Sequence, residues 1–264
     1  MRRFAYERPA TLAEATRLLA EAGEDARVLA GGTDLVVGLR DDSVRPAVVV
    51  DLKRIEELQG EPIAEDGDII RFTALATMSQ AEHSPLVQAE LPALAEAARV
   101  VGSVQIRNRA TLAGNVCNGS PAADTMPPQL IYGAMIVVVG PDGQRRVPID
   151  AFILGARRPG PDKRVVDLHP GELVVAIEIP RYEPPFGAAY TRLVRRRGTD
   201  LASITLAAAV AEDDSVHIAY GSVGPRPFLV WDDSGVLADP AADPERRATV
   251  LDAVSYTHLR AHET

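Results

Sequence analysis

The apolar pattern near the N-terminus, to about residue 55, predicts a small unit of helices and strands. After Thr11-Leu12-Ala13-Glu14, a sequence typical of a helix start, apolar residues recur at helical spacing until Gly23. Two short apolar runs follow, and the second is a continuous β-branched stretch typical of a buried strand. We therefore expect a helix, a strand, a glycine turn, a short helix and a strand over residues 12–22, 27–30, 31–32, 35–39 and 47–52.

The middle of the chain combines strand patterns with one interrupted helical pattern. Two of the strands are expected to form a hairpin around Pro141-Asp142-Gly143. A helical pattern that begins at Pro85 is broken or restarted by Pro92. The stretch from Gly102 to Asp124 has no clear period, so we expect a long ordered loop there. The strands are expected over 69–74, 134–139, 145–149 and 173–179, and the helix over 85–101.

A proline-rich linker, Arg181-Tyr182-Glu183-Pro184-Pro185, precedes a C-terminal block with the local spacing of antiparallel strands. We place a boundary near Ile179. The predicted class is α+β, with a first domain over 1–179, whose subdomains are about 1–55 and 56–179, and a second over 180–254. The second domain is expected to contain strands over 188–194, 202–211 and 216–223 and a helix over 245–253.

The composition narrows the class of protein. Of the 264 residues, 46% are hydrophobic and 25% charged, as in ordinary globular proteins. The net charge of −9 argues against a nucleic-acid-binding protein. We find no signal peptide and no apolar run long enough for a membrane span, so we expect a cytoplasmic protein. The single cysteine, Cys117, excludes an all-cysteine iron–sulfur or zinc site within one chain, and the scattered histidines do not predict a metal site.

The first candidate motif is Leu29-Ala30-Gly31-Gly32-Thr33-Asp34-Leu35. Glycines allow a positive φ and let backbone N–H groups approach a ligand, and successive free N–H groups form an anion-binding site. The hydroxyl of Thr33 adds a donor, whereas Asp34 suits a helix N-cap or a ligand hydroxyl. A tight turn without a ligand remains the alternative, since paired glycines are common in turns. The motif matches neither the Rossmann nor the P-loop spacing.

The second candidate motif, Thr111-Leu112-Ala113-Gly114-Asn115, has similar chemistry, with a hydroxyl, small residues, a glycine and an amide. An ordered connecting loop is again the alternative. Two such motifs in one domain fit a ligand with several polar groups, such as a dinucleotide. Asp124, in Ser120-Pro121-Ala122-Ala123-Asp124, either accepts from a ribose or ribityl hydroxyl or caps the following helix.

Together, the two motifs resemble the FAD-binding medium subunit of molybdenum hydroxylases, the xanthine dehydrogenase and carbon monoxide dehydrogenase family. The resemblance runs from about Phe4 to Pro227 and includes the arginine-rich context Gln105-Ile106-Arg107-Asn108-Arg109-Ala110. It implies a two-subdomain FAD-binding fold of the vanillyl-alcohol-oxidase/PCMH type, followed by a small α+β domain with an antiparallel sheet. It also implies FAD-binding roles for Leu29, Ala30, Gly31, Gly32, Thr33, Asp34, Leu35, Thr111, Leu112, Ala113, Gly114, Asn115, Asp124, Val174 and Arg192.

Two positions and the end of the chain depart from the pattern of the family, and one basic cluster has two interpretations. Arg192 stands where lysine is frequent, and Ala113 stands where glycine is usual, which is tolerable if its φ stays negative. The segment 255–264 resembles no part of the family, so we expect an incomplete C-terminal domain followed by a non-native tail. The basic cluster Arg195-Arg196-Arg197 is interpreted as a solvated strand end or as a docking patch.

The resemblance implies an electron-transfer role rather than substrate chemistry at this chain. Electrons would pass from [2Fe–2S] clusters of a small subunit to FAD, and then to NAD⁺, oxygen or a quinone, after oxidation of a substrate in a large molybdenum-cofactor subunit. We name no catalytic acid or base, because the redox chemistry belongs to the cofactor. Two alternatives stay open: a stand-alone flavin-dependent oxidoreductase and an assembly subunit without FAD.

Overall fold

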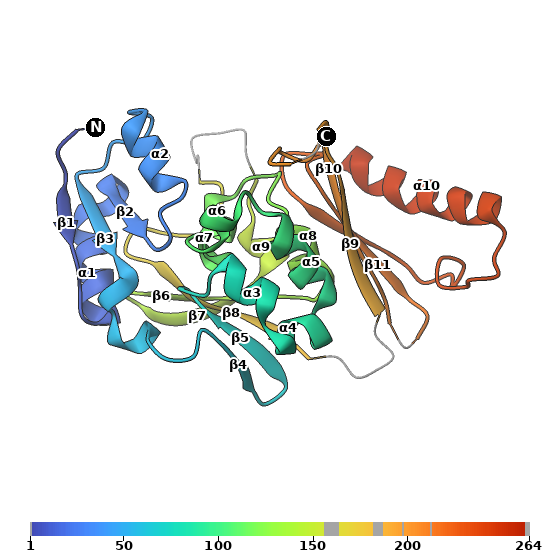
Figure 1. Cartoon of the computed structure of the whole chain (residues 1–264), viewed down its shortest axis with the longest axis horizontal. Coiled ribbons are helices and arrows are strands. Elements are labelled where there is room, and N and C mark those ends of the chain that lie inside the picture. Colours follow the sequence, from blue (N-terminus) through green and yellow to red (C-terminus); the bar gives the residue numbers. More distant parts are fainter. Residues whose placement is uncertain (1, 156–163, 182–186, 197, 212, 262–264) are drawn as a thin grey trace.

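The computed structural model describes residues 2–155, 164–181, 187–196, 198–211 and 213–261, with side chains as far as Ser255. The chain forms three separate β-sheets, and helices lie beside each of them (Figure 1). The expected combination of helices and separate, largely antiparallel sheets, an α+β arrangement, is therefore present.

The N-terminal unit is a three-stranded parallel sheet in the order β1-β3-β2. Its first helix begins as predicted, because the hydroxyl of Thr11 accepts a hydrogen bond from the N–H of Glu14 at 3.2 Å, and it ends at Gly23, whose φ is 55°. The first strand was not predicted. The elements are β1 (Ala5–Glu7), α1 (Leu12–Ala22), β2 (Ala26–Leu29), α2 (Leu35–Arg40) and β3 (Val48–Asp51), with 3₁₀ turns η1 (Gly23–Asp25), η2 (Leu52–Arg54) and η3 (Glu56–Leu58).

A five-stranded antiparallel sheet, in the order β4-β5-β8-β6-β7, forms the centre of the molecule. Strand β8 is buried along almost its whole length, which explains its continuous apolar sequence. The strands are β4 (Ile63–Asp66), β5 (Ile69–Thr73), β6 (Met135–Gly140), β7 (Gly143–Pro148) and β8 (Leu173–Pro180). The helices are α3 (Met78–His83), α4 (Pro85–Glu90), α5 (Pro92–Val100), α6 (Val104–Arg107), α7 (Leu112–Asn118), α8 (Met126–Ile131) and α9 (Ile149–Phe152).

The prediction of an irregular loop over 102–124 is wrong. Two short helices, α6 and α7, occupy much of this stretch, and each begins where a hydroxyl caps it: Ser103 for α6 and Thr111 for α7. Gly119, with φ of 62°, ends α7 in the left-handed conformation typical of a C-cap. The helices are too short for an apolar period to reveal them, so only their caps were visible in the sequence.

The C-terminal block is a four-stranded antiparallel sheet in the order β12-β11-β10-β9, and α10 (Pro244–Ala261) lies beside this sheet (Figure 1). Within the sheet, α10 contacts β12. Three of its strands were predicted, whereas β12, which follows a proline-containing turn, was not. The strands are β9 (Gly187–Leu193), β10 (Ile204–Val210), β11 (Val216–Gly221) and β12 (Phe228–Asp232). The segment expected to be a non-native tail continues α10 as far as Ala261, and the side chains of residues 256–264, with both tail histidines, lie outside the described part.

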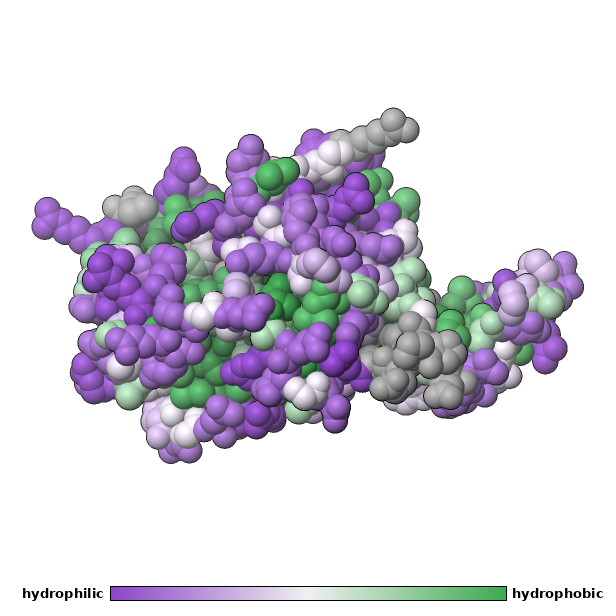
Figure 2. All heavy atoms as spheres, turned by 60° about the horizontal axis from the view of Figure 1, so that its bottom comes forward, coloured by the Kyte–Doolittle hydropathy of each residue, from purple (hydrophilic) through white to green (hydrophobic). Residues whose placement is uncertain are grey.

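One large hydrophobic core runs from α1 through the central sheet to the inner face of the C-terminal sheet. A smaller cluster on the other face of that sheet is formed by Val216, Ile218, Phe228 and Val230. On the face seen in Figure 2, hydrophilic residues predominate, with hydrophobic residues gathered between them. In the described part of the chain, no helix has the length and apolar character that a membrane crossing requires.

Candidate functional site

A cleft of about 1460 Å³ brings the two glycine-containing motifs together. This volume exceeds the 300–1,000 Å³ that is usual for small-ligand sites, so it has room for an extended ligand. Three predicted residues do not line the cleft: Leu29, Leu112, which is fully buried, and Arg192. The predicted residues that do line it are Ala30, Gly31, Gly32, Thr33, Asp34, Leu35, Thr111, Ala113, Gly114, Asn115, Asp124 and Val174.

Gly31 is the point where the two motifs touch. A Cβ on Gly31 would lie 1.9 Å from the carbonyl oxygen of Arg109, which belongs to the backbone just before the second motif. No side chain fits there without moving one backbone segment away from the other. Gly32 is required for a second reason, because its φ is 78° and its Cβ would lie 2.8 Å from Cδ1 of Leu29. The glycine pair is therefore needed for shape, and not only for a turn.

The first motif presents unused hydrogen-bond donors to the cleft. No residue that the structure describes accepts a hydrogen bond from the backbone N–H groups of Gly31, Gly32, Thr33 or Asp34. Consecutive free N–H groups form a concave site for an anion such as a phosphate. Asp34 stands at the N-cap position of α2, yet its side chain makes no capping bond. The exposed carboxylate thus remains available to a ligand hydroxyl.

A buried carboxylate, Asp51, is connected to the first motif through the side chain of Lys53. Asp51, at the end of β3, is 1% exposed; it accepts a hydrogen bond from the hydroxyl of Tyr6 and pairs with Nζ of Lys53 at 2.6 Å. The same Nζ lies 3.4 Å from the carbonyl oxygen of Ala30. Burial favours the protonated carboxyl, but the bonds from Lys53 and Tyr6 outweigh it and lower the pKa of Asp51.

The second motif is the start of a helix rather than a loop. Oγ1 of Thr111 accepts from the N–H of Gly114 at 3.0 Å, and the carbonyl of Thr111 accepts from the N–H of Asn115 at 3.0 Å. The N–H of Leu112 bonds to the carbonyl of Ala76 at 3.0 Å. Oδ1 of Asn115 accepts from the hydroxyl of Thr125 at 2.7 Å. Most of the donors expected to bind a ligand are therefore satisfied within the protein.

Asp124 does not cap the following helix. Thr125 occupies the N-cap position of α8, and its side chain makes no capping hydrogen bond. Asp124 instead accepts from the hydroxyl of Tyr190 at 2.6 Å and pairs with Nη1 of Arg192 at 3.3 Å, both on β9. Burial raises the pKa of Asp124 against the opposing effects of these two partners. The pKa of Tyr190 is also raised, by burial and by the charge of Asp124. Sequence reasoning missed Tyr190, although its spacing of two from Arg192 places both on one face of a strand.

Sequence reasoning also missed the loop that precedes β8, which forms one wall of the cleft. Its lining residues include Val165, Val166, Leu168 and His169, and the wall continues into Val174. Val174 is 5% exposed at the start of β8. No motif in the sequence singles out this loop, because its place beside the cleft depends on contacts with distant strands.

The remaining candidates are arginines in ion pairs and the single cysteine. Arg107 pairs with Glu82 at 2.8 Å and so braces α6 against α3. Arg195 and Arg196 both pair with Asp200 but are largely exposed, and Arg196 lines the cleft, so the interpretation as a solvated strand end or a docking patch stays a prediction. Arg197 lies outside the described residues. Cys117 packs against the core, and burial raises the pKa of its thiol to about 12, which disfavours the reactive thiolate.

Comparison with known proteins agrees with this geometry. Residues 2–182 match the family described as FAD binding domain in molybdopterin dehydrogenase. The chain is 37% identical over 228 residues to the putative xanthine dehydrogenase FAD-binding subunit of Escherichia coli K12, covering 84% of this chain and 75% of that protein. It is 34% identical over 227 residues to the carbon monoxide dehydrogenase medium chain of Hydrogenophaga pseudoflava, covering 84% and 76%.

A solved structure supports the fold. A chain of reconstituted CO dehydrogenase from Oligotropha carboxidovorans superimposes with a TM-score of 0.84 at 30% identity, covering 96% of this chain and 86% of that one. The predicted FAD-binding fold is therefore confirmed. The cleft fits the cofactor of the family, because it offers length, a glycine cradle and unpaired backbone donors. The chain belongs to the family of FAD-binding domains of molybdopterin dehydrogenases, and its cofactor is FAD.

Proposed function

We propose that this chain is the electron-transfer subunit of a molybdenum hydroxylase complex. Its relatives include a xanthine dehydrogenase FAD-binding subunit and a carbon monoxide dehydrogenase medium chain. In this proposal a small subunit supplies electrons through [2Fe–2S] clusters, and a large subunit holds the molybdenum cofactor. When bound, FAD supplies the redox chemistry that links these one-electron carriers to a final acceptor, which is NAD⁺, oxygen or a quinone.

The first motif supports the proposal most strongly, because its residues line the cleft and their N–H groups have no acceptor among the described residues. We assign the pyrophosphate of FAD to the donors of Gly31, Gly32, Thr33 and Asp34. Charge-assisted hydrogen bonds from backbone N–H groups to phosphate are about twice as strong as neutral ones. The contact between Gly31 and the Arg109 carbonyl holds this loop against the second motif, so the second motif shapes the site more than it donates to the ligand.

Asp124 and the start of β8 mark the end of the cleft assigned to the flavin and its polyol chain. Asp124 lines the cleft while it accepts from Tyr190 and pairs with Arg192. A carboxylate oxygen has more than one lone pair, so Asp124 can also accept from a ligand hydroxyl. Val174 offers an aliphatic surface for an aromatic ring in the same region. Arg192 is 14% exposed and outside the cleft lining, so we assign it to holding Asp124 rather than to touching the cofactor.

The described cleft gives no support to a stand-alone oxidoreductase that acts directly on a substrate. Such an enzyme would use a dedicated acid or base beside the flavin. Tyr190 is tied to Asp124, and its raised pKa keeps it protonated. His169 stands beside Arg164 on the wall of the cleft, with Nε2 3.4 Å from a carboxylate oxygen of Asp167. Tyr190 is thus not free to act as a base, and we assign His169 to the cleft wall, where it contacts Arg164 and Asp167.

The test is to purify the full chain, record its visible spectrum, and titrate the apoprotein with FAD. We expect a flavin spectrum and saturable FAD binding. Co-expression with candidate large and small subunits then tests the complex: we expect a stable assembly in which the flavin is reduced by substrate only when all three subunits are present. A chain that binds FAD but is reduced directly by a substrate would contradict the electron-transfer proposal. A chain that takes up no FAD would contradict the assignment of the cleft.

A further inference from the structure

The loop over residues 164–172 lines the same cleft as the glycine motif, and residues outside the cleft hold its conformation. Leu168, His169 and Glu172 line the cleft. The loop starts from a bridge between Val166 and Ile153 and leads directly into β8. A wall of this kind receives a ligand without reorganisation only if its backbone is held in place.

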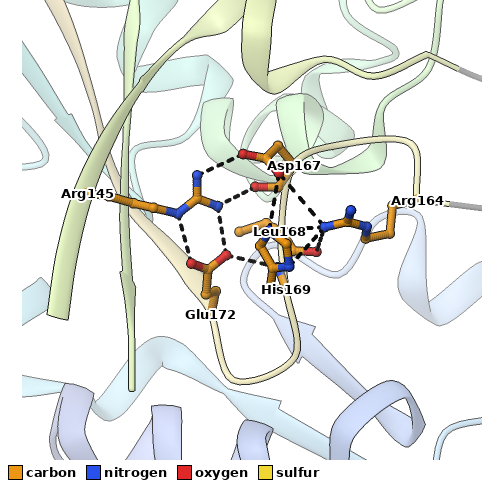
Figure 3. Close-up of polar contacts among 6 residues, drawn as sticks. All are labelled: Arg145, Arg164, Asp167, Leu168, His169 and Glu172. Atoms are coloured by element: carbon orange, nitrogen blue, oxygen red, sulfur yellow. Dashed lines mark hydrogen bonds and ion pairs between the residues drawn. The ribbon is translucent and has the colours of Figure 1, made fainter. Parts of the chain in front are cut away.

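Arg145, on β7, contacts both ends of the segment 167–172 through one guanidinium (Figure 3). Its Nε and Nη2 donate to the two carboxylate oxygens of Glu172, each at 2.8 Å. Its Nη1 donates to Oδ2 of Asp167 at 2.8 Å, and its Nη2 donates to the carbonyl oxygen of Asp167 at 2.7 Å. The planar guanidinium thus fixes a side chain and a backbone group at one end of the segment and a carboxylate at the other.

The segment has further contacts that depend on this conformation. Oε2 of Glu172 also accepts from the N–H of His169 at 2.9 Å. Gly171 has φ of 88°, and its Cβ would lie 2.9 Å from Cγ of Pro141 and 3.1 Å from Cβ of Ala20. The segment therefore packs against both the β6–β7 hairpin and α1, and it contacts the N-terminal unit as well as the central sheet.

Electrostatics supports the same arrangement. The pKa of Glu172 is lowered, since the bonds from Arg145 and from the His169 backbone outweigh the effect of burial. The pKa of Asp167 is lowered in the same way, mainly by Arg145 with smaller effects of His169 and Arg164. Without Arg145, the two carboxylates would lose the partner that they share on β7.

We propose that Arg145 is a positioning residue of the cofactor site, which holds the 164–172 wall in the conformation that receives FAD. Arg145 does not line the cleft, so it acts on the cofactor only through the loop. This inference rests on the proposed placement of FAD in the cleft.

The test measures FAD affinity in the full chain with Arg145→Gln, Arg145→Lys and Arg146→Gln. Arg146 is the matched control: it is the next residue on β7, points to the opposite face, and pairs with Glu178 on β8 rather than with the loop. We expect the dissociation constant for FAD to rise about tenfold or more in Arg145→Gln, to rise less in Arg145→Lys, which keeps the charge but not the planar fork, and to stay within about twofold of wild type in Arg146→Gln.

A second readout separates positioning from general stability. The unfolding temperature of each apoprotein is measured beside its FAD association and dissociation rates. We expect Arg145→Gln to release FAD faster even at a temperature far below its unfolding transition. Wild-type affinity in a folded Arg145→Gln protein, or equal weakening in Arg146→Gln, would overturn the proposal. Failure of the wild type to bind FAD would instead overturn the proposed function, so the two failures are distinguishable.

Discussion

The two glycine-containing motifs have similar sequences and opposite physical roles. In residues 31–34, four consecutive N–H groups have no acceptor among the described residues. At the start of α7, the N–H groups of Leu112, Gly114 and Asn115 all have acceptors within the protein. Thr111 and Ala113 are 4% and 3% exposed, so the first half of the second motif is buried, whereas Gly114 is exposed at the cleft. In the proposed assignment, the first motif donates to the cofactor and the second holds the first motif in place through the contact of Gly31 with the Arg109 carbonyl.

Small residues and hydroxyls therefore do not by themselves identify a ligand-binding loop. In the second motif, the hydroxyl of Thr111 caps its own helix, and a Cβ on Gly114 would lie 2.8 Å from that hydroxyl. Variants that change one motif and spare the other test this difference.

The largest effect is expected for Gly31→Ala. Its Cβ would overlap the carbonyl of Arg109, so the first motif must leave the second and its N–H groups no longer converge. Losing several such bonds corresponds to about 3 kcal/mol, or about a hundredfold in the dissociation constant of FAD. The control is Gly187→Ala, because Gly187 has open space around it. Tight FAD binding by Gly31→Ala would show that the contact between the motifs does not shape the site.

The second largest effect on FAD affinity is expected for Gly32→Val, which introduces a β-branched side chain at a φ of 78°. Backbone strain there costs about 1–2 kcal/mol, and the side chain also obstructs the approach of the ligand. We expect FAD retention to be lost during purification. Gly67→Val is the control, since Gly67 also has a positive φ, of 61°, but lies on a surface turn with nothing near its Cβ. Full flavin occupancy in a folded Gly32→Val protein would refute the pyrophosphate assignment.

A pair of threonine variants separates the two roles directly. Thr33→Val removes a hydroxyl from the donor motif, and we expect FAD affinity to fall about threefold to tenfold while apoprotein stability changes by less than about 0.5 kcal/mol. Thr111→Val removes a helix cap, and we expect the reverse: unfolding free energy falls by about 0.5–2 kcal/mol while affinity changes little. Denaturant unfolding and FAD titration of both variants measure the two quantities. If both variants lose the same amounts of stability and affinity, or if Thr111→Val loses affinity and Thr33→Val loses stability, the two motifs do not have the different roles described above.

The smallest effect on FAD affinity is expected for Asp51→Asn, which removes the charge that pairs with Lys53, the residue in contact with the Ala30 carbonyl oxygen. Because the folded-state pKa of Asp51 is lowered, its ionised form contributes stability above its unfolded value near 3.8, and this contribution is lost as the pH falls through the folded value. We expect the wild type to be more stable than Asp51→Asn at pH 7 and the difference to narrow below about pH 4. A difference in unfolding free energy that is independent of pH would show that the charge of Asp51 is not what stabilises the fold.

Much of the fold could be predicted from local patterns. The helix α1 had a visible cap and a glycine end, and β3, β6 and β8 had continuous apolar runs. The strands β1 and β4 were missed because most of their residues are exposed and polar or small, whereas β12 was missed despite its apolar sequence. The helices α6 and α7 were missed because they are too short to show an apolar period.

The sequence predicted the glycine motifs, Asp124 and Val174 as part of the cleft, but not the partners that hold these residues. Asp124 meets Tyr190 and Arg192 across more than sixty residues of chain, as the separation of 66 between Asp124 and Tyr190 records. Arg145 meets Asp167 and Glu172 in a similar way, through the pairing of β7 with the central sheet. Such contacts depend on topology and register, which a single sequence does not specify. The roles of these residues therefore emerged only from the structure.

The most direct test of the account is amide hydrogen exchange, resolved by residue, on the full chain with and without FAD. The account predicts that the amides of Gly31, Gly32, Thr33 and Asp34 exchange fast in the apoprotein and become protected when FAD binds, whereas those of Gly114 and Asn115 are already protected without it. Slow exchange of residues 31–34 in the apoprotein, or no change on FAD binding, would contradict the claim that this motif holds the cofactor.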